Sequence, residues 1–191
     1  MKNILFVLIL VHLYSCDNNS FVKDKNINNI EDKITPENSK VYKYIKEFKE
    51  NNNLTNNDNS IRLEKGNELF RDSISLFLSS KNSLSDYPIK LNKVYLNSNN
   101  KAVANFMSES YLGFNLIGNL EEDVALNLVE GSTYLVYGEF DKFMPTEYTG
   151  MVKGSLYTPL IKIDSGILND NIASLGIFTY KIDTIVEFKN K

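Results

Sequence analysis

The sequence contains no tryptophan, one cysteine and one histidine among its 191 residues. A structural zinc site of the Cys/His type needs four such ligands, so this chain cannot supply one by itself. A disulfide within the chain is excluded because it needs two cysteines. Acidic residues outnumber lysine and arginine by 24 to 21, which gives a formal net charge of −3. The chain therefore lacks the basic excess typical of nucleic-acid-binding proteins, and we expect no nucleic-acid partner.

Apolar residues, in contrast, are plentiful. They make up 42% of the chain and include 11 tyrosines and 11 phenylalanines. This content is sufficient for a hydrophobic core, and the length is typical of one compact domain with a tail.

The first 16 residues have the features of an export leader. Lys2 provides a positive start, and Ile4 to Leu13 form an apolar run interrupted only by His12. This run is too short to span a bilayer, which takes about 20 residues. Its length and position therefore predict a signal peptide rather than a membrane helix.

The end of the leader, Leu13-Tyr14-Ser15-Cys16, resembles the lipobox of bacterial lipoproteins. The resemblance implies cleavage between Ser15 and Cys16, so that residues 1–15 are the signal peptide. It also implies lipidation of Cys16 by a diacylglyceryl group and acyl chains such as palmitate, which anchor the protein to an envelope membrane. The Asn/Lys/Ile-rich style of the leader and the residues after it is similar to that of spirochaetal outer-surface lipoproteins, which implies an outer-membrane or cell-surface location.

Loss of the leader would remove the only histidine and occupy the only thiol. A Ser-His-Asp triad and a Cys-His pair would then both be impossible in the mature protein. The glycines at 113 and 118 lack the spacing and the lysine of a phosphate-binding loop. We therefore expect no enzyme, no cofactor and no metal.

Residues 16–35 predict a lipidated cysteine followed by a flexible tether, because Asn, Asp and Lys dominate without a sustained apolar period. The alternative is a docking peptide that folds on a partner.

Residues 36–82 predict a helical segment. Thr35-Pro36-Glu37 is typical of a helix start, and 61–81 fits a second helix better than a short strand.

Residues 83–191 predict a β-rich domain, so the expected fold class is α+β. Strands are expected at 88–96, 101–107, 111–118, 132–143, 158–164 and 176–188, with a short helix opening at Glu121. Gly138 suggests a bulge within the long strand. The order of three strands, a helix and a long strand resembles the OB-fold over roughly residues 88–164, which implies a curled antiparallel sheet or a small β-barrel.

Two groups of residues are candidates for function. Tyr148, Met151 and Tyr157 lie in a long connection, residues 144–158, and are predicted to form a binding loop; the alternative is a β-hairpin extension or a simple mobile loop. Glu139 and Asp141 stand two apart on the expected long strand, so both carboxylates should point the same way. Such a pair can perform glycoside hydrolysis, although most exposed pairs of this kind are only solvated.

These features together predict a membrane-anchored lipoprotein whose non-enzymatic, β-rich domain lies outside the cytoplasm and binds a protein or glycan partner. The alternatives are a periplasm-facing envelope assembly factor or an enzyme inhibitor, and, more remotely, a carboxylate-dependent glycan hydrolase.

Overall fold

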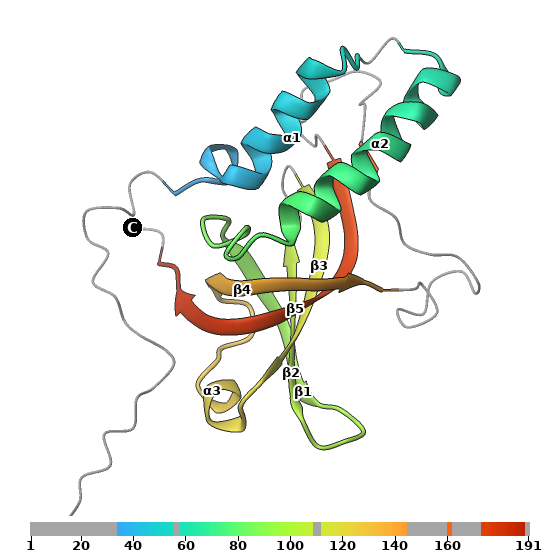
Figure 1. The fold of residues 1–191 in the computed structure, drawn as a ribbon. Helices are drawn as coiled ribbons and strands as arrows, with labels where there is room; N and C mark the ends of the chain where they lie inside the picture. The colour runs from blue at the N-terminus through green and yellow to red at the C-terminus, as the bar shows by residue number, and fades with distance from the viewer. Residues whose placement is uncertain (1–33, 56–57, 109–111, 145–159, 162–172, 190–191) are drawn as a thin grey trace, which may run out of the picture.

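A computed structural model describes residues 34–55, 58–108, 112–144, 160–161 and 173–189. Figure 1 shows two helices packed above a curled sheet, with a third, short helix at the opposite end of the sheet. The α+β fold class with helices preceding a curled sheet is confirmed.

The N-terminal helical pair consists of α1 (Lys40–Asn51) and α2 (Ser60–Leu78), and a 3-10 turn, η2 (Pro36–Asn38), precedes it. Thr35 was expected to cap the helix, and this was wrong. The cap is Ser39, whose hydroxyl accepts a hydrogen bond from the Tyr42 amide at 3.2 Å. Pro36 instead begins η2, because a proline at the first position of a turn needs no amide partner.

The two helices pack through an aromatic and aliphatic seam. The Tyr44 and Phe77 rings stack with centroids 4.3 Å apart, and Phe48 packs against Phe70 at 5.4 Å. Val41 and Ile45 of α1 are fully buried. Val41, Tyr44, Ile45 and Phe48 recur every three or four residues along the sequence, so they form one apolar stripe on α1.

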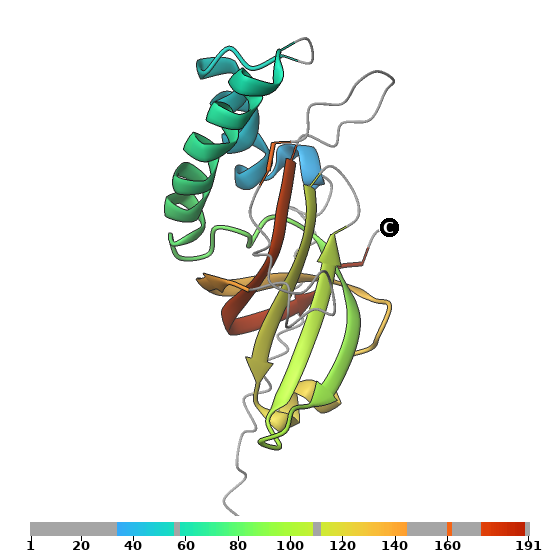
Figure 2. The ribbon, with the colours of Figure 1, turned by 90° about the vertical axis from the view of Figure 1, so that its right-hand side faces the viewer.

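The strands of the sheet are β1 (Ile89–Leu96), β2 (Ala102–Ser108), β3 (Leu112–Leu120), β4 (Thr133–Phe143) and β5 (Ala173–Glu187). The helix α3 (Glu122–Leu126) connects β3 to β4. Hydrogen-bonded neighbours follow the order β1-β2-β3-β5-β4, and a short β1–β4 pairing at Ile89–Tyr134 and Lys90–Thr133 closes the sheet into a ring. Figure 2 shows β1, β2 and β3 side by side.

The expectation of a purely antiparallel sheet needs a correction, because β3 and β5 pair in parallel. The reason is geometric. Strand directions can alternate around a closed ring only if the number of strands is even. Five strands therefore require one parallel pair, and here the other four pairs are antiparallel.

The C-terminal part of the sheet also differs from the expectation. Of the expected strand at 158–164, only residues 160 and 161 lie in the described part of the chain, and Leu160 forms an isolated bridge with Ser174. The final strand starts at Ala173, three residues earlier than expected, and it takes the fifth place in the ring. The fifth strand of the ring is therefore β5 and not the expected strand at 158–164.

Gly138 forms the bulge that the sequence suggests, with the register of β4 and β5 shifting between Tyr137 and Gly138. Its backbone is held from two sides. The backbone N–H of Gly138 donates a hydrogen bond to the side-chain oxygen of Asn82 at 2.9 Å. The Gly138 carbonyl accepts two hydrogen bonds, one from the backbone N–H of Asn82 at 2.7 Å and one from the Tyr180 hydroxyl at 3.0 Å. Burial raises the pKa of Tyr180 to about 12, so this phenol stays a hydrogen-bond donor at neutral pH. The bulge thus joins the sheet to the segment that follows α2.

Candidate functional site

Several residues singled out in the sequence lie outside the described part of the chain. They are the leader and its cleavage site, Ser15 and Cys16, the tether up to residue 33, and the expected binding loop with Tyr148, Met151 and Tyr157. Their roles stay predictions.

The carboxylate pair on β4 is described, and its geometry differs from the expectation. A second bulge lies between Phe140 and Lys142, so Asp141 has no cross-strand partner. Two residues that flank or form a bulge do not keep the simple alternation of a strand, so the spacing of Glu139 and Asp141 no longer implies one shared direction. Both residues are exposed, and the Asp141 carboxylate accepts a hydrogen bond from the Thr179 hydroxyl at 2.8 Å. Nothing in this arrangement positions the two carboxylates as an acid and base.

A cleft of about 360 Å³ lies at the end of the sheet that carries α3, opposite the helical pair. We call it the α3-end cleft. It is formed where the β1–β2 turn, the end of β3, the start of α3 and the middle of β5 meet. We call its buried and half-buried apolar lining residues the floor: Ala102, Leu120, Val124, Ile182 and Ile185. We call its polar lining residues, all exposed except the half-buried Thr184, the rim: Asn100, Lys101, Asn119, Glu121, Glu122, Asp183 and Thr184.

Gly118 lacks a side chain, and this allows Ile182 of the floor to pack directly on the backbone of β3. A Cβ at Gly118 would lie 2.2 Å from the Ile182 Cδ1, so only a glycine allows Ile182 to take its present position. A glycine inside an otherwise apolar strand often marks such a close approach. The sequence predictions do not include this cleft, and Gly118 is the one local signal of it in the sequence.

The rim carries an excess of negative charge. Asp183 forms an ion pair with Lys81 at 3.2 Å, outside the cleft. Glu121 and Glu122 have no ion pair with any described residue, and only Lys101 on the rim opposes them. The Glu121 side chain does not cap α3, so its carboxylate is free to meet a partner.

Exposed apolar side chains lie near the cleft at the same end of the molecule. Leu126 of α3 is 79% exposed, Leu96 at the end of β1 is 59% exposed, and Val129 is exposed to the same extent as Leu96. The segment after α3 is held against β1 because the Val94 amide donates to the Glu130 carboxylate at 2.8 Å. Large apolar side chains at a polar-rimmed hollow are typical of a protein-binding surface.

A second cleft, of about 470 Å³, lies beside β1 and the start of β4. Among the described residues that line it, Lys90 is the only charged one. This second cleft is larger than the α3-end cleft, but its lining carries fewer charged groups. Charges and directed polar groups determine which partner a site selects, so this cleft is the weaker candidate for a specific binding site.

Comparison of the chain with protein-family models, with curated proteins and with solved structures gives no match. None of the described helices is both long and apolar enough to cross a membrane.

Proposed function

We propose that this protein is a lipoprotein, anchored through Cys16 to an envelope membrane outside the cytoplasm, whose non-enzymatic domain binds a partner protein at the α3-end cleft. The cleft is the observation that carries the binding function, since it combines an apolar floor with a charged rim. The Leu13-Tyr14-Ser15-Cys16 sequence supports the anchor, and the Asn/Lys/Ile-rich style of the leader and the residues after it supports an outer-membrane or cell-surface location.

The position of the cleft fits an anchored protein. The described chain enters the fold at Ile34, beside the helical pair, while α3 lies at the far end of the sheet (Figure 1). An anchor that precedes residue 34 would join the domain to the membrane from its helical end, through the expected flexible tether. A binding surface at the α3 end would therefore lie away from the point of attachment.

The chemistry of the cleft favours a protein segment over a glycan. Its described lining contains aliphatic side chains and no aromatic ring, whereas sugar rings are commonly bound on aromatic faces. The apolar floor suits one leucine- or isoleucine-sized side chain, and the acidic rim suits an adjacent lysine or arginine. We therefore infer that the partner presents an apolar residue next to a cationic one.

Binding of a labelled peptide tests the cleft. A fluorescent peptide of alternating leucine and lysine is expected to bind the full chain in detergent, and a peptide of alternating leucine and glutamate is not. The double substitution Glu121→Gln/Glu122→Gln should weaken binding by roughly 5- to 50-fold, because it removes two rim charges. Fluorescence polarisation measures the affinity.

The matched control is Glu47→Gln/Glu50→Gln, which makes the same change of net charge on α1. It should leave the affinity unaltered. Equal losses in both double variants would show that the peptide binds only through overall charge, and tighter binding of an oligosaccharide than of the peptide would favour a glycan partner.

The anchor is tested separately with Cys16→Ser. We expect this variant to lose labelling by a radioactive fatty acid and to move from the membrane fraction to the soluble fraction, since each buried CH₂ contributes about 0.8 kcal/mol to membrane binding. Ser20→Ala, which lies after the cysteine, is the control. Fatty-acid labelling of the Cys16→Ser chain, or an unmodified thiol at Cys16 in the native protein, would contradict the anchor.

A further inference from the structure

The outer face of α2 carries large apolar side chains that do not pack on the described part of this chain. Ile61 is 65% exposed, Leu69 is 58% exposed and Leu76 is 77% exposed. Residues of an α-helix follow each other at about 100° around its axis, so these positions lie within one stripe less than a quarter-turn wide. A single exposed apolar side chain is ordinary, but three in one stripe form an unpartnered face among the described residues.

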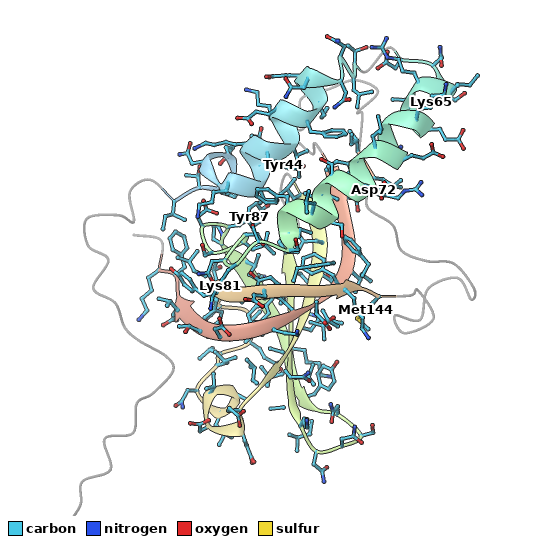
Figure 3. The ribbon with its side chains drawn as sticks, in the orientation of Figure 1. Tyr44, Lys65, Asp72, Lys81, Tyr87 and Met144 are labelled. Atoms are coloured by element: carbon cyan, nitrogen blue, oxygen red, sulfur yellow. The ribbon has the colours of Figure 1, made fainter. Side chains whose placement is uncertain are left out.

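This stripe points away from α1. The residues of α2 that meet α1 and the segment after it are Gly66, Phe70 and Phe77, which contact Leu54, Phe48 and Tyr44. Lys65 and Asp72 lie on the opposite side of the helix, between the exposed apolar residues, and both are exposed (Figure 3). The stripe therefore consists of three apolar and three charged residues: Ile61, Lys65, Glu68, Leu69, Asp72 and Leu76.

The order of residues in the stripe is self-complementary. Ile61 and Leu76 are equally far from a point between Glu68 and Leu69, and Lys65 and Asp72 are equally far from the same point. If a second copy of α2 lies antiparallel on the first with a two-fold axis at that point, each Ile61 meets the partner's Leu76. Each Lys65 then meets the partner's Asp72. Such reciprocal matching is the requirement of a two-fold interface.

We propose that the outer face of α2 is a self-association surface, on which a second copy of this chain packs antiparallel around a two-fold axis between Glu68 and Leu69. The two Leu69 side chains would meet each other beside the two-fold axis, along one edge of the contact. The two Glu68 carboxylates would approach each other along the opposite edge of the contact. Lys65 lies three residues before Glu68 on the same helix, so it is a neighbour of opposite charge to each carboxylate.

The expected association is weak in solution. A single stripe on one helix buries much less than the ~800 Å² per partner typical of stable complexes. Confinement of both copies to one membrane would raise their effective concentration and strengthen the pairing. The inference itself depends on the α2 face alone and does not need the anchor.

Cross-linking of the full chain in its native membrane or cell extract tests the proposal. Leu69→Cys should give a cross-linked dimer with a short bis-maleimide, because the two positions meet beside the axis. Lys46→Cys on the exposed part of α1 should give none. A dimer from the parent chain without an added cysteine would instead report an unmodified Cys16, and would therefore count against the anchor and not against the α2 contact.

Charge exchange then tests the geometry. In the Leu69→Cys chain, Lys65→Glu alone and Asp72→Lys alone should each reduce cross-linking by roughly tenfold, since two attractive pairs become repulsive. Co-expression of the two variants with different tags should restore a mixed dimer, because Glu at 65 then faces Lys at 72. The same exchanges on α1, Lys46→Glu and Glu47→Lys, should change nothing.

Rescue by mixing separates association from folding, because a folding defect in one chain is not repaired by another. Absence of the mixed dimer, or equal cross-linking at Lys46→Cys and Leu69→Cys, would overturn the proposal. Replacement of Glu68 by glutamine should increase the dimer yield, and a decrease would also contradict the proposed axis.

Discussion

Replacement of Gly138 by alanine is expected to destabilise the protein by more than about 4 kcal/mol, which is a large part of the about 5–15 kcal/mol that stabilises a typical native protein. A Cβ at this position would lie 2.0 Å from the carbonyl oxygen of Lys181. That atom belongs to the backbone of β5, so no side-chain rotation can relieve the clash. The β4–β5 pairing would have to open at the bulge, and the hydrogen bonds that Gly138 makes with Asn82 and Tyr180 would be strained with it. Urea unfolding followed by circular dichroism measures the loss.

Gly131→Ala is the matched control for this prediction. Gly131 also has a positive φ, +86°, but a Cβ there would meet no atom within 4 Å. The cost should therefore be only the left-handed strain of an L-residue, about 1–2 kcal/mol. A similar loss in both variants would show that strain, and not the contact with β5, determines the effect at Gly138.

Phe178→Ala is expected to have the second-largest effect, a loss of about 3–5 kcal/mol of unfolding free energy. Phe178 is fully buried and lies at the centre of an aromatic cluster inside the sheet. Its ring centroid is 5.7 Å from that of Phe114, 5.7 Å from that of Phe140 and 6.0 Å from that of Phe143. Truncation leaves a cavity among side chains that come from three strands, and these strands cannot collapse around it without breaking the closed ring.

Phe178→Leu keeps most of the volume and should cost clearly less than the alanine variant in the same urea experiment. Equal losses for leucine and alanine would mean that the ring contacts matter and the cavity does not. A loss below about 1 kcal/mol for alanine would contradict the placement of Phe178 at the centre of the core.

The local parts of the fold were predictable from the sequence. The apolar spacing within 36–82 indicated helices, and the structure contains them as α1 and α2. The alternation in 101–107 and 111–118 indicated strands, and the structure contains these as β2 and β3. Gly138 indicated its bulge because a glycine within an apolar strand has few other reasons to be there. These features depend on neighbours a few residues apart, and such neighbours are visible in a sequence.

The features that were wrong or missed depend on residues far apart in the chain. The parallel β3–β5 pair follows from closure of a five-stranded ring, which no single strand reveals. The bulge at Asp141 depends on the register with Thr179, and it changed the interpretation of the Glu139–Asp141 spacing. The α3-end cleft joins residues 100–102, 119–124 and 182–185, three segments without a common motif.

The sequence by itself determined the helix and strand types, the absence of cysteine and histidine after residue 16, and the prediction of a lipid anchor at Cys16. These follow from residue identity and short-range periodicity. Only the tertiary structure decided which surfaces are free: the apolar face of α2 that does not meet α1, and the cleft beside α3. A side chain is exposed or covered according to which distant segments pack on it, and that is settled only when the ring of strands closes.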